Sequence, residues 1–437
     1  MPTRMKPTVL VVGGGFAGRA TVRALDDYGE KVRVVYVDEK PFFEFTPSIL
    51  RCIVQPQRLD SITFDHDETE NRRFALGRVT LITPSEATVE RREGNRVTFI
   101  SVPYDYCVWA TGVSFSEPIR SSQAYNEPCT IHKRSSELER YRTKCMVANE
   151  ILIVGGGPIG VELCAELVAL TKSQENARIT LGCSPRGLLP RLPDKASKFA
   201  EDWLSRKAVR IVRSRLFPCG VDDEGKFKYT SESDPSFVVI ADVVFDCTGA
   251  KSNGASDALI VGGVVDEKYL RRDGSIDIRD TLQTWDMPHF FVAGDAAHVD
   301  GELDLDRFAC EKTAYAAEEA GKLAALNVVR LMQGERLVSA QSTAMKCYPV
   351  NAFPFGQFPR LFVISLYKYD GILCLGPLVI CGKLPALTKF LIEFLGVESA
   401  KWNGFWAFIF RSLEYITYLL AYLFQILLTS PRRPAMH

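Results

Sequence analysis

Two stretches of the chain share one order of apolar and glycine-rich segments. Each begins with a short apolar run that is typical of a buried parallel strand, at 8–12 and at 151–154. Each run enters a glycine-rich turn, a helix-like segment follows, and a second apolar run comes next, which ends at Asp38 in the first stretch and at Gly182 in the second. The pattern predicts a strand–turn–helix–strand unit that occurs twice.

The glycines of both turns have the spacing G-x-G-x-x-G, as GGGFAG at 13–18 and GGGPIG at 155–160. In such a turn the first glycine allows the tight bend, the second lets the backbone approach a pyrophosphate, and the third lets helix and strand pack closely. The helix N-terminus then offers unpaired N–H groups and a positive dipole end to the phosphates. Asp38 lies about 20 residues beyond the first turn, where a carboxylate accepts hydrogen bonds from ribose hydroxyls. The first unit is therefore a predicted dinucleotide site.

The second unit differs from the first at the end of its second strand. It ends in Gly182-Cys183-Ser184 and has no acid there. An acid would favour the free 2′-hydroxyl of NAD, so its absence, with Arg186 nearby, favours NADPH or the use of both nucleotides. An Arg186 that simply lies on the surface is an equally good interpretation.

Later strands also end in small residues. ATG at 110–112 and CTG at 247–249 suit places where backbone passes close to a cofactor. Asp295 follows a third such strand, and its carboxylate can accept hydrogen bonds from a ribityl chain. An alanine-rich helix predicted over 306–332 would direct the N–H groups near Lys312 towards the pyrimidine edge of a flavin. An ordinary packing helix is the alternative.

Two further segments have a recognisable pattern. Phe42, Phe43 and Phe45 form an aromatic loop that would reach a flavin ring, although plain core aromatics would give the same sequence. Residues 74–90 and 96–108 alternate between apolar and polar positions, which predicts strands of a small antiparallel layer.

The end of the chain is strongly apolar. From 404 to 429 only Arg411 and Glu414 are charged, and as a helix this segment would span about 39 Å, against roughly 30 Å of bilayer hydrocarbon. Its aromatic residues suit a membrane interface, and Arg432-Arg433 follow as a basic stop. We therefore expect a tail anchor or a deeply inserted helix pair. A helix buried in the protein or in a dimer interface is the alternative.

Composition narrows the function. The 437-residue chain has 53 Lys and Arg and 53 Asp and Glu, so no net field favours nucleic acid, and no nucleic-acid partner is expected. Its 12 cysteines are scattered without a C-x-x-C pair, as expected for free thiols in a reducing compartment. A dithiol relay beside a flavin therefore has no candidate, and electrons would leave directly to a small molecule or to oxygen.

Together these motifs resemble the two-dinucleotide flavoproteins of the glutathione-reductase structural class, over about residues 8–330. FFEFTPSILRCIVQP at 42–56 and AYAA at 314–317 are similar to the ferroptosis-suppressor and apoptosis-inducing-factor-like branch, which is mitochondrion-associated. The related type II NADH dehydrogenases carry glutamines where this chain has Tyr315 and Glu319. The resemblance implies an α/β fold with two Rossmann-type dinucleotide-binding domains and a C-terminal hydrophobic membrane-associating region.

The resemblance also implies domain boundaries and site residues. The FAD-binding domain would comprise 1–120 and 251–334, the NAD(P)H-binding domain 121–250, a region near the acceptor site 335–401, and a membrane anchor 402–437. Glu162 would position the nicotinamide amide, unless it is a solvated helical carboxylate, and Lys312 and Tyr315 would border the flavin ring on the acceptor side. No metal ligand is expected. The cofactor-binding residues would be Gly13, Gly14, Gly15, Gly18, Asp38, Arg51, Val79, Thr111, Gly112, Gly155, Gly157, Gly160, Gly249, Gly294 and Asp295.

The function that the resemblance implies is a membrane-associated, FAD-dependent NAD(P)H:quinone oxidoreductase. A hydride would pass from NAD(P)H to flavin N5 and then to a quinone. The alternatives are an NAD(P)H oxidase, a ferredoxin-type reductase, and a non-enzymatic redox-sensing effector like apoptosis-inducing factor. The expected location is the cytoplasmic face of a membrane, without a distinction between lipid droplet, outer mitochondrial and endoplasmic reticulum membranes. Whether the chain forms a homodimer is left open.

Overall fold

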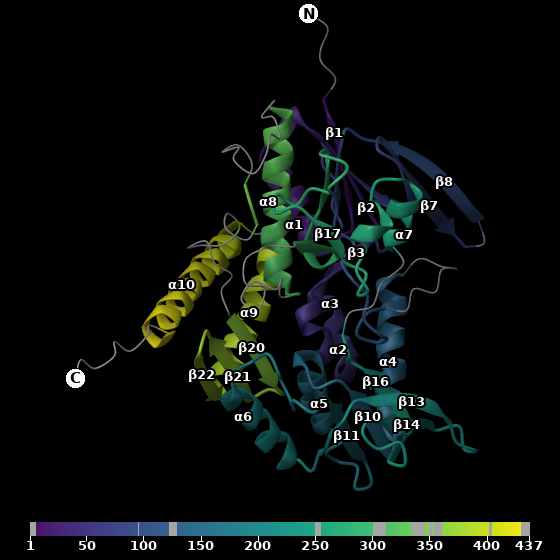
Figure 1. The fold of residues 1–437 in the computed structure, drawn as a ribbon, viewed down its shortest axis with the longest axis vertical. Helices are drawn as coiled ribbons and strands as arrows, with labels where there is room; N and C mark the ends of the chain where they lie inside the picture. The colour runs from purple at the N-terminus through teal and green to yellow at the C-terminus, as the bar shows by residue number, and fades with distance from the viewer. Residues whose placement is uncertain are drawn as a thin grey trace, which may run out of the picture.

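Parallel strands form the centre of the upper half of the molecule in Figure 1. The computed structural model describes residues 6–94, 96–121, 129–249, 255–299, 312–333, 346–348, 352, 361–401 and 404–429. The first repeated unit supplies the middle of a five-stranded sheet, whose neighbouring strands all pair in parallel. Its order is β18 (Phe290–Val292), β9 (Tyr106–Trp109), β1 (Thr8–Val12), β2 (Arg33–Asp38) and β5 (Arg72–Leu76).

The second repeated unit forms a separate four-stranded parallel sheet in the lower half of Figure 1. The predicted strand–turn–helix–strand order is thus present in both copies, with α1 (Phe16–Asp26) following the first turn and α5 (Pro158–Leu170) the second. The order of the second sheet is β12 (Arg210–Arg213), β11 (Arg178–Cys183), β10 (Glu150–Val154) and β16 (Val243–Asp246).

Between strands of each parallel sheet, the chain also forms a three-stranded antiparallel layer. The predicted layer at 74–90 and 96–108 is present, but its ends belong elsewhere, because Phe74 lies in β5 and Tyr106 begins β9, both in the parallel sheet. In β9 the side chains from Cys107 to Trp109 are buried on both faces, which an alternating pattern does not predict. The layers are β6 (Arg78–Ile82), β7 (Glu86–Glu93) and β8 (Arg96–Pro103), and β13 (Leu216–Val221), β14 (Phe227–Ser231) and β15 (Val238–Ala241).

Helices α1 and α8 (Ala314–Met332) lie side by side. A Cβ on Gly321 would lie 2.2 Å from the carbonyl oxygen of Ala17, so only glycine allows the two helices to come this close. Helix α8 begins later than predicted, with Thr313 as its N-cap accepting a hydrogen bond from the Ala316 N–H. The earlier part of the predicted helix, at 306–311, lies outside the described residues.

The remaining elements connect the sheets or cover their faces. The helices are α2 (Ile49–Val54), α3 (Leu59–Ile62), α4 (Ile131–Val147), α6 (Asp194–Ser205) and α7 (Ala255–Val261). The strands are β3 (Phe42–Glu44), β4 (Thr63–Asp65), β17 (Ile276–Ile278) and β19 (Ala297–Val299).

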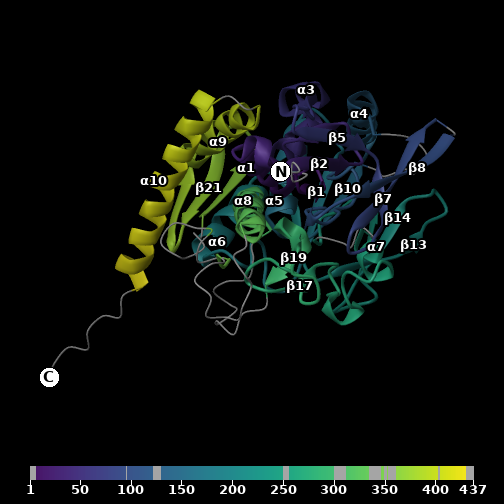
Figure 2. The same ribbon diagram turned by 90° about the horizontal axis from the view of Figure 1, so that it is seen from above.

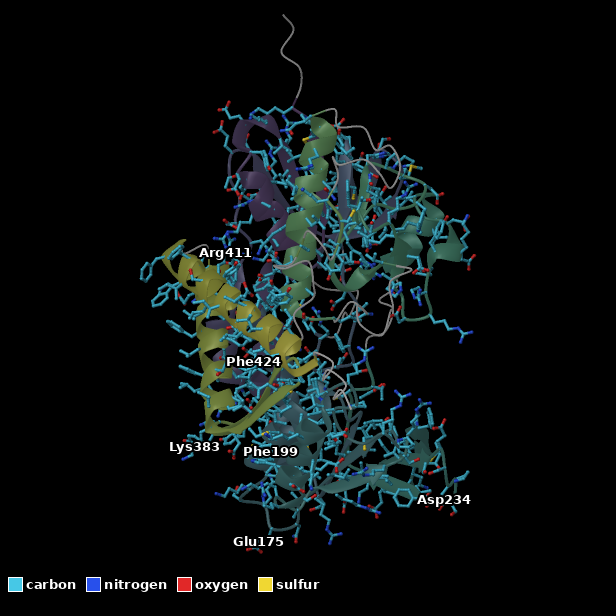
Figure 3. The ribbon with its side chains drawn as sticks, turned by 60° about the vertical axis from the view of Figure 1, so that its left-hand side comes forward. Glu175, Phe199, Asp234, Lys383, Arg411 and Phe424 are labelled. Carbon is cyan, nitrogen blue, oxygen red and sulfur yellow. The ribbon has the colours of Figure 1, made fainter. Side chains whose placement is uncertain are left out.

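The C-terminal region forms a sheet covered by two helices. Strands β20 (Leu361–Leu366), β21 (Asp370–Leu375) and β22 (Leu378–Gly382) are antiparallel, and α9 (Lys383–Ala400) and α10 (Gly404–Thr429) follow. Figure 2 shows α10 along the outer edge of the molecule, and Figure 3 shows it crossing α9 between the labelled Arg411 and Phe424.

Helix α10 has two different faces. Ala421 packs with Leu373 and Leu375 of β21, whereas Phe405 and Phe408 are 66% and 72% exposed. The stretch from 404 to 424 has the length and composition of a membrane-crossing helix. The proposed basic stop at 432–433 lies outside the described residues, as does Trp402.

Two arginines of α1 bind the last carbonyls of α9. Arg19 donates to the Ala400 oxygen at 2.7 Å and Arg23 to the Ser399 oxygen at 3.2 Å. Cations at a helix C-terminus satisfy its free carbonyls and its dipole. The C-terminal helix pair is therefore attached to the first dinucleotide unit.

Candidate functional site

The first glycine of each turn touches the backbone of a neighbouring strand end. Gly13 has φ +107° and Gly155 has φ +121°, a region that favours glycine. A Cβ on Gly13 would lie 2.4 Å from the Ala110 oxygen, and one on Gly155 would lie 2.5 Å from the Cys247 oxygen. The two turns therefore have matching geometry, and each is closed against its ATG or CTG segment.

The other two glycines of each turn also match. A Cβ on Gly18 would lie 1.8 Å from the Gly13 oxygen, and one on Gly160 would lie 1.9 Å from the Gly155 oxygen, so both are packing glycines. Gly15 and Gly157 begin α1 and α5 as N-caps, and a Cβ at either position would meet no heavy atom within 4 Å. An open N-terminus with free N–H groups fits a pyrophosphate at each turn.

Asp38 lies at the first turn, as predicted. Its Oδ2 accepts from the Gly14 N–H, and its Oδ1 accepts from the Lys40 N–H at 2.7 Å. The carboxylate is thereby held against the turn beside the cavity, where a ribose hydroxyl can reach it.

The Gly294 turn is packed between the first turns of α1 and α8. A Cβ on Gly294, which has φ +72°, would lie 2.9 Å from the Cβ of Ala17 and 3.4 Å from that of Ala317. Burial raises the pKa of Asp295, against the opposing charges of Arg120 and Lys312. The structure therefore brings the first glycine turn, Gly294 and Asp295 together, as expected for one flavin site.

One cavity joins these features. It has a volume of about 2240 Å³, well above the roughly 300–1,000 Å³ of a single-ligand pocket. Arg51, Gly18 and Gly160 are not among the residues that line it. The other proposed residues do line it, namely Gly13, Gly14, Gly15, Asp38, Val79, Thr111, Gly112, Gly155, Gly157, Glu162, Gly249, Gly294, Asp295, Lys312 and Tyr315.

Arg51 has a different partner from the one expected. Its Nε donates to Oε1 of Glu166 on α5 at 2.6 Å. Burial raises the pKa of Glu166 to about 6, with Arg51 opposing. The pair joins α2 to α5, so a direct contact of Arg51 with a cofactor stays a prediction.

Glu162 lies on the first turns of α5 and binds the C-terminal region. Its Oε1 accepts from the Ser365 N–H at 2.8 Å, from the Ser365 hydroxyl at 3.2 Å and from the Lys389 ammonium at 3.1 Å. The sequence analysis did not find Ser365 or Lys389. No local pattern marks them, because their partner lies 203 and 227 positions away.

Lys312 and Tyr315 lie at the start of α8. The Lys312 ammonium donates to Asp273 at 2.9 Å, and the pKa of Asp273 is lowered because Ser275 and Lys312 outweigh the effect of burial. The Tyr315 ring stacks on the Tyr418 ring of α10, with centroids 4.6 Å apart. Tyr315 is therefore covered by the C-terminal helix.

At the second turn, arginines other than the expected one face the cavity. Arg191 and Arg215 line it together with Ser184, whereas Arg186 does not. The preference for NADPH stays a prediction.

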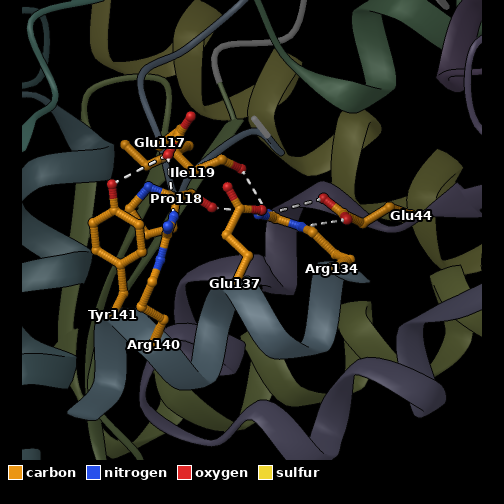
Figure 4. Close-up of polar contacts among 8 residues, drawn as sticks. All are labelled: Glu44, Glu117, Pro118, Ile119, Arg134, Glu137, Arg140 and Tyr141. Carbon is orange, nitrogen blue, oxygen red and sulfur yellow. Dashed lines mark hydrogen bonds and ion pairs between the residues drawn. The ribbon is translucent and has the colours of Figure 1, made fainter. Parts of the chain in front are cut away.

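A buried arginine supports the wall of the cavity (Figure 4). Arg134 of α4 is fully buried and donates to Glu44 at 3.0 Å, to Glu137 at 2.7 Å, and to the Pro118 and Ile119 oxygens at 2.8 and 3.3 Å. Burial would raise the pKa of Glu44, but Lys40 and Arg134 hold it below its ordinary value. The network fixes β3, with its aromatic loop, to the segment that follows the ATG turn.

The described cysteines contain no disulfide; every one is a free thiol. Burial raises the pKa of Cys52, in α2, to about 12. A thiol with such a pKa is a poor nucleophile. Cys52, the cysteine nearest the aromatic loop in the sequence, is therefore a poor candidate for redox chemistry, and the absence of a dithiol relay stays a prediction.

The chain is similar to known oxidoreductases over most of its length. The family described as "Pyridine nucleotide-disulphide oxidoreductase" matches residues 7–321. Apoptosis-inducing factor homolog B of Dictyostelium discoideum is 26% identical, over 76% of this chain and 83% of that protein. Ferroptosis suppressor protein 1 of Xenopus laevis is 24% identical, over 76% and 82%. The predicted resemblance to ferroptosis-suppressor and apoptosis-inducing-factor-like proteins is thus confirmed.

Two solved structures have the same fold. NDH2 from Plasmodium falciparum, in complex with NADH, aligns with a TM-score of 0.69 at 12% identity, over 99% of this chain and 100% of that one. The sulfide:quinone oxidoreductase of Aquifex aeolicus aligns with a TM-score of 0.67 at 15% identity, over 90% and 92%. The first alignment includes the C-terminal sheet and helices.

Proposed function

The chain belongs to the pyridine nucleotide-disulphide oxidoreductase family, and we propose that it is an FAD-dependent NAD(P)H:quinone oxidoreductase attached to a membrane surface. Membership of this family implies FAD and NAD(P)H as cofactor and substrate. The quinone acceptor, the membrane attachment and the roles of individual residues are inferred from the cavity and the C-terminal helices.

One observation carries the proposal: a single cavity is lined by both glycine turns and by the apolar C-terminal helices. On α9 and α10 its lining includes Leu391, Leu395, Phe410 and Leu413. Apolar lining of this kind suits a lipid-soluble acceptor. The same helices expose apolar side chains outwards, so the acceptor and the lipid would meet at one place.

The residues have distinct roles under this proposal. The first turn with Asp38 and Asp295 would hold FAD, and the second turn would hold NAD(P)H. When bound, FAD supplies two-electron hydride chemistry between a nicotinamide and an acceptor. The ion pair with Lys389 holds the Glu162 carboxylate in place, and the N-terminus of α8 with Lys312 would provide positive charge on the acceptor side.

The names of proteins with the same fold agree with a quinone acceptor and with NADH as the reductant. The neighbour from Aquifex aeolicus is a sulfide:quinone oxidoreductase, and NDH2 binds NADH. The sequence has no C-x-x-C pair, which favours direct reduction of a small molecule over a disulfide substrate.

The membrane part rests on the two faces of α10. One face packs on the C-terminal sheet through Ala421, and the other exposes phenylalanines. A helix packed on its own domain along one side suits a position in the plane of the interface. We therefore propose that α9 and α10 lie on one leaflet.

The test is steady-state turnover of purified protein with NADH and with NADPH against short-chain ubiquinone, menadione and oxygen. We expect a yellow protein whose flavin absorbance is bleached by NAD(P)H and restored by quinone much faster than by oxygen. A protein without residues 402–437 should keep the bleaching but lose vesicle-dependent turnover. A colourless protein, or a flavin that NAD(P)H does not bleach, would refute the proposal, and equal rates with oxygen would favour an oxidase.

A further inference from the structure

Two tyrosines join α8 to α10 at the acceptor side. The rings of Tyr315 and Tyr418 stack with an interplanar angle of 27°, and their hydroxyls share a hydrogen bond. Tyr418 is 4% exposed, and both residues line the cavity that also contains Asp295. A hydroxyl pair therefore lies between the flavin side of the cavity and the C-terminal helix.

A carboxyl group continues this pair towards the surface. The Tyr418 hydroxyl donates to Oε1 of Glu414, one helical turn earlier, at 3.3 Å. The titratable groups facing Glu414 are Tyr418 and Tyr315, and Glu318, Glu319 and Lys322 of α8, where Lys322 donates to Glu319.

The acidic group on α8 is itself perturbed. Burial raises the pKa of Glu318, against the charges of Lys322, Arg411 and Arg23. Glu318 and Glu414 both line the cavity, so the two carboxyl groups belong to its wall. Neighbouring carboxyl groups in a low dielectric favour shared protons.

Quinone reduction needs a proton that the nicotinamide does not bring. In the overall reaction NAD(P)H, one proton and a quinone give NAD(P)⁺ and a quinol. One hydrogen of the quinol arrives with the electron pair as hydride, and the other arrives as a proton from solvent. On α9 and α10 the cavity is lined by apolar residues such as Leu391 and Phe410, which cannot deliver a proton. The titratable lining residues of these two helices are Lys389, which is paired with Glu162, and Glu414 and Tyr418.

We propose that Glu414, Tyr418 and Tyr315 form the relay that delivers this proton to the quinone. When Glu414 carries a proton, its hydrogen bond with Tyr418 reverses and Glu414 becomes the donor. Tyr315 then donates to the quinone oxygen, Tyr418 returns a proton to Tyr315, and Glu414 returns one to Tyr418. Solvent then reprotonates Glu414 along Glu318 and Glu319. The inference rests on the proposed function and adds residues of α10 to its machinery.

The test compares two acceptors in E414Q and Y418F. Ferricyanide takes single electrons and no proton, so two ferricyanides oxidise NADH to NAD⁺ and release one proton. We expect quinone turnover to fall by roughly 10²-fold in both variants, the size of a lost general acid, with ferricyanide turnover unchanged. Y418F keeps the stacked ring, so it remains informative if E414Q folds poorly.

The pH profile and a control variant separate a relay from a structural role. Wild-type quinone turnover should fall as the pH rises and Glu414 loses its proton, whereas E414Q should be slow at every pH. E398Q on α9, where Glu398 binds Lys401 at 2.9 Å, should behave like wild type. An infrared difference spectrum should show a protonated carboxyl band, shifted in D₂O, in wild type and not in E414Q.

Other outcomes would contradict the relay or the proposed function. If both acceptors slow together, or if E414Q reduces quinone at the wild-type rate, the relay is wrong while the quinone reductase activity stands. If the wild type reduces ferricyanide and no quinone, the proposed function and the relay fail together.

Discussion

At the residue scale, the three spaced glycines of each G-x-G-x-x-G turn have three different structural roles. In the second turn Gly155 touches the Cys247 carbonyl, Gly160 packs on Gly155, and Gly157 faces open space. The spacing predicted these roles because a tight turn at a helix start has few solutions. The partner of Glu162 could not be predicted in this way, because Ser365 and Lys389 are brought to it by tertiary packing.

The difference between the glycines is testable with one methyl group. Gly155→Ala places a Cβ 2.5 Å from the Cys247 oxygen at a φ of +121°, so we expect a loss of about 1–3 kcal/mol in the free energy of unfolding. Gly157→Ala meets no atom within 4 Å, so the protein should stay stable while KM for NAD(P)H rises. Thermal unfolding without nucleotide measures the stability of both variants, and initial-rate kinetics measure their KM. Equal destabilisation by the two substitutions would contradict the different roles of the two glycines.

At the scale of elements, the repeated units were predictable and the boundaries between layers were not. Alternation assigned Phe74 and Tyr106 to an antiparallel layer, whereas both lie in parallel strands, since pairing with β2 and β1 decides the sheet. The tail helix was predicted from its composition. Its packing on β21 and on Tyr315 was not predicted, because apolar residues occur on all sides of this helix and do not indicate which side packs.

The attachment of α4 to the wall of the cavity rests on Arg134. In Arg134→Met the carboxylates of Glu44 and Glu137 lose the cation that they share, so we expect a loss of about 3–5 kcal/mol in the free energy of unfolding. Arg142→Met on the same helix removes a more exposed pair with Glu139 and should cost about 0–1 kcal/mol. Denaturant unfolding of both variants measures the difference, and similar losses would mean that the buried network is not the support.

At the scale of the whole molecule, the apolar surface gathers on one flank. Leu384, Leu387, Phe390, Phe405 and Phe408 are between 55% and 72% exposed. Several large apolar side chains exposed on two neighbouring helices are typical of an interaction site. The apolar composition of the tail predicted this flank, but only the fold shows that α9 shares it.

Binding to lipid should therefore depend on this flank. Phe405→Asp combined with Phe408→Asp should weaken binding to phospholipid vesicles by roughly 10²-fold, because about 3 kcal/mol of apolar burial is lost. Phe99→Asp, at a 62% exposed position of β8, is the matched control and should leave binding unchanged. Vesicle flotation measures both, and equal binding of the double variant and the control would remove the membrane from the proposal.

The two guanidinium groups that hold the end of α9 belong to the helix that begins at Gly15. Helix α1 therefore joins the first glycine turn to the helix pair that we propose lies on lipid. Such a connection makes the affinities for cofactor and for a bilayer reciprocal. If bound cofactor raises the affinity for the bilayer by some factor, adsorption on the bilayer raises the affinity for the cofactor by the same factor.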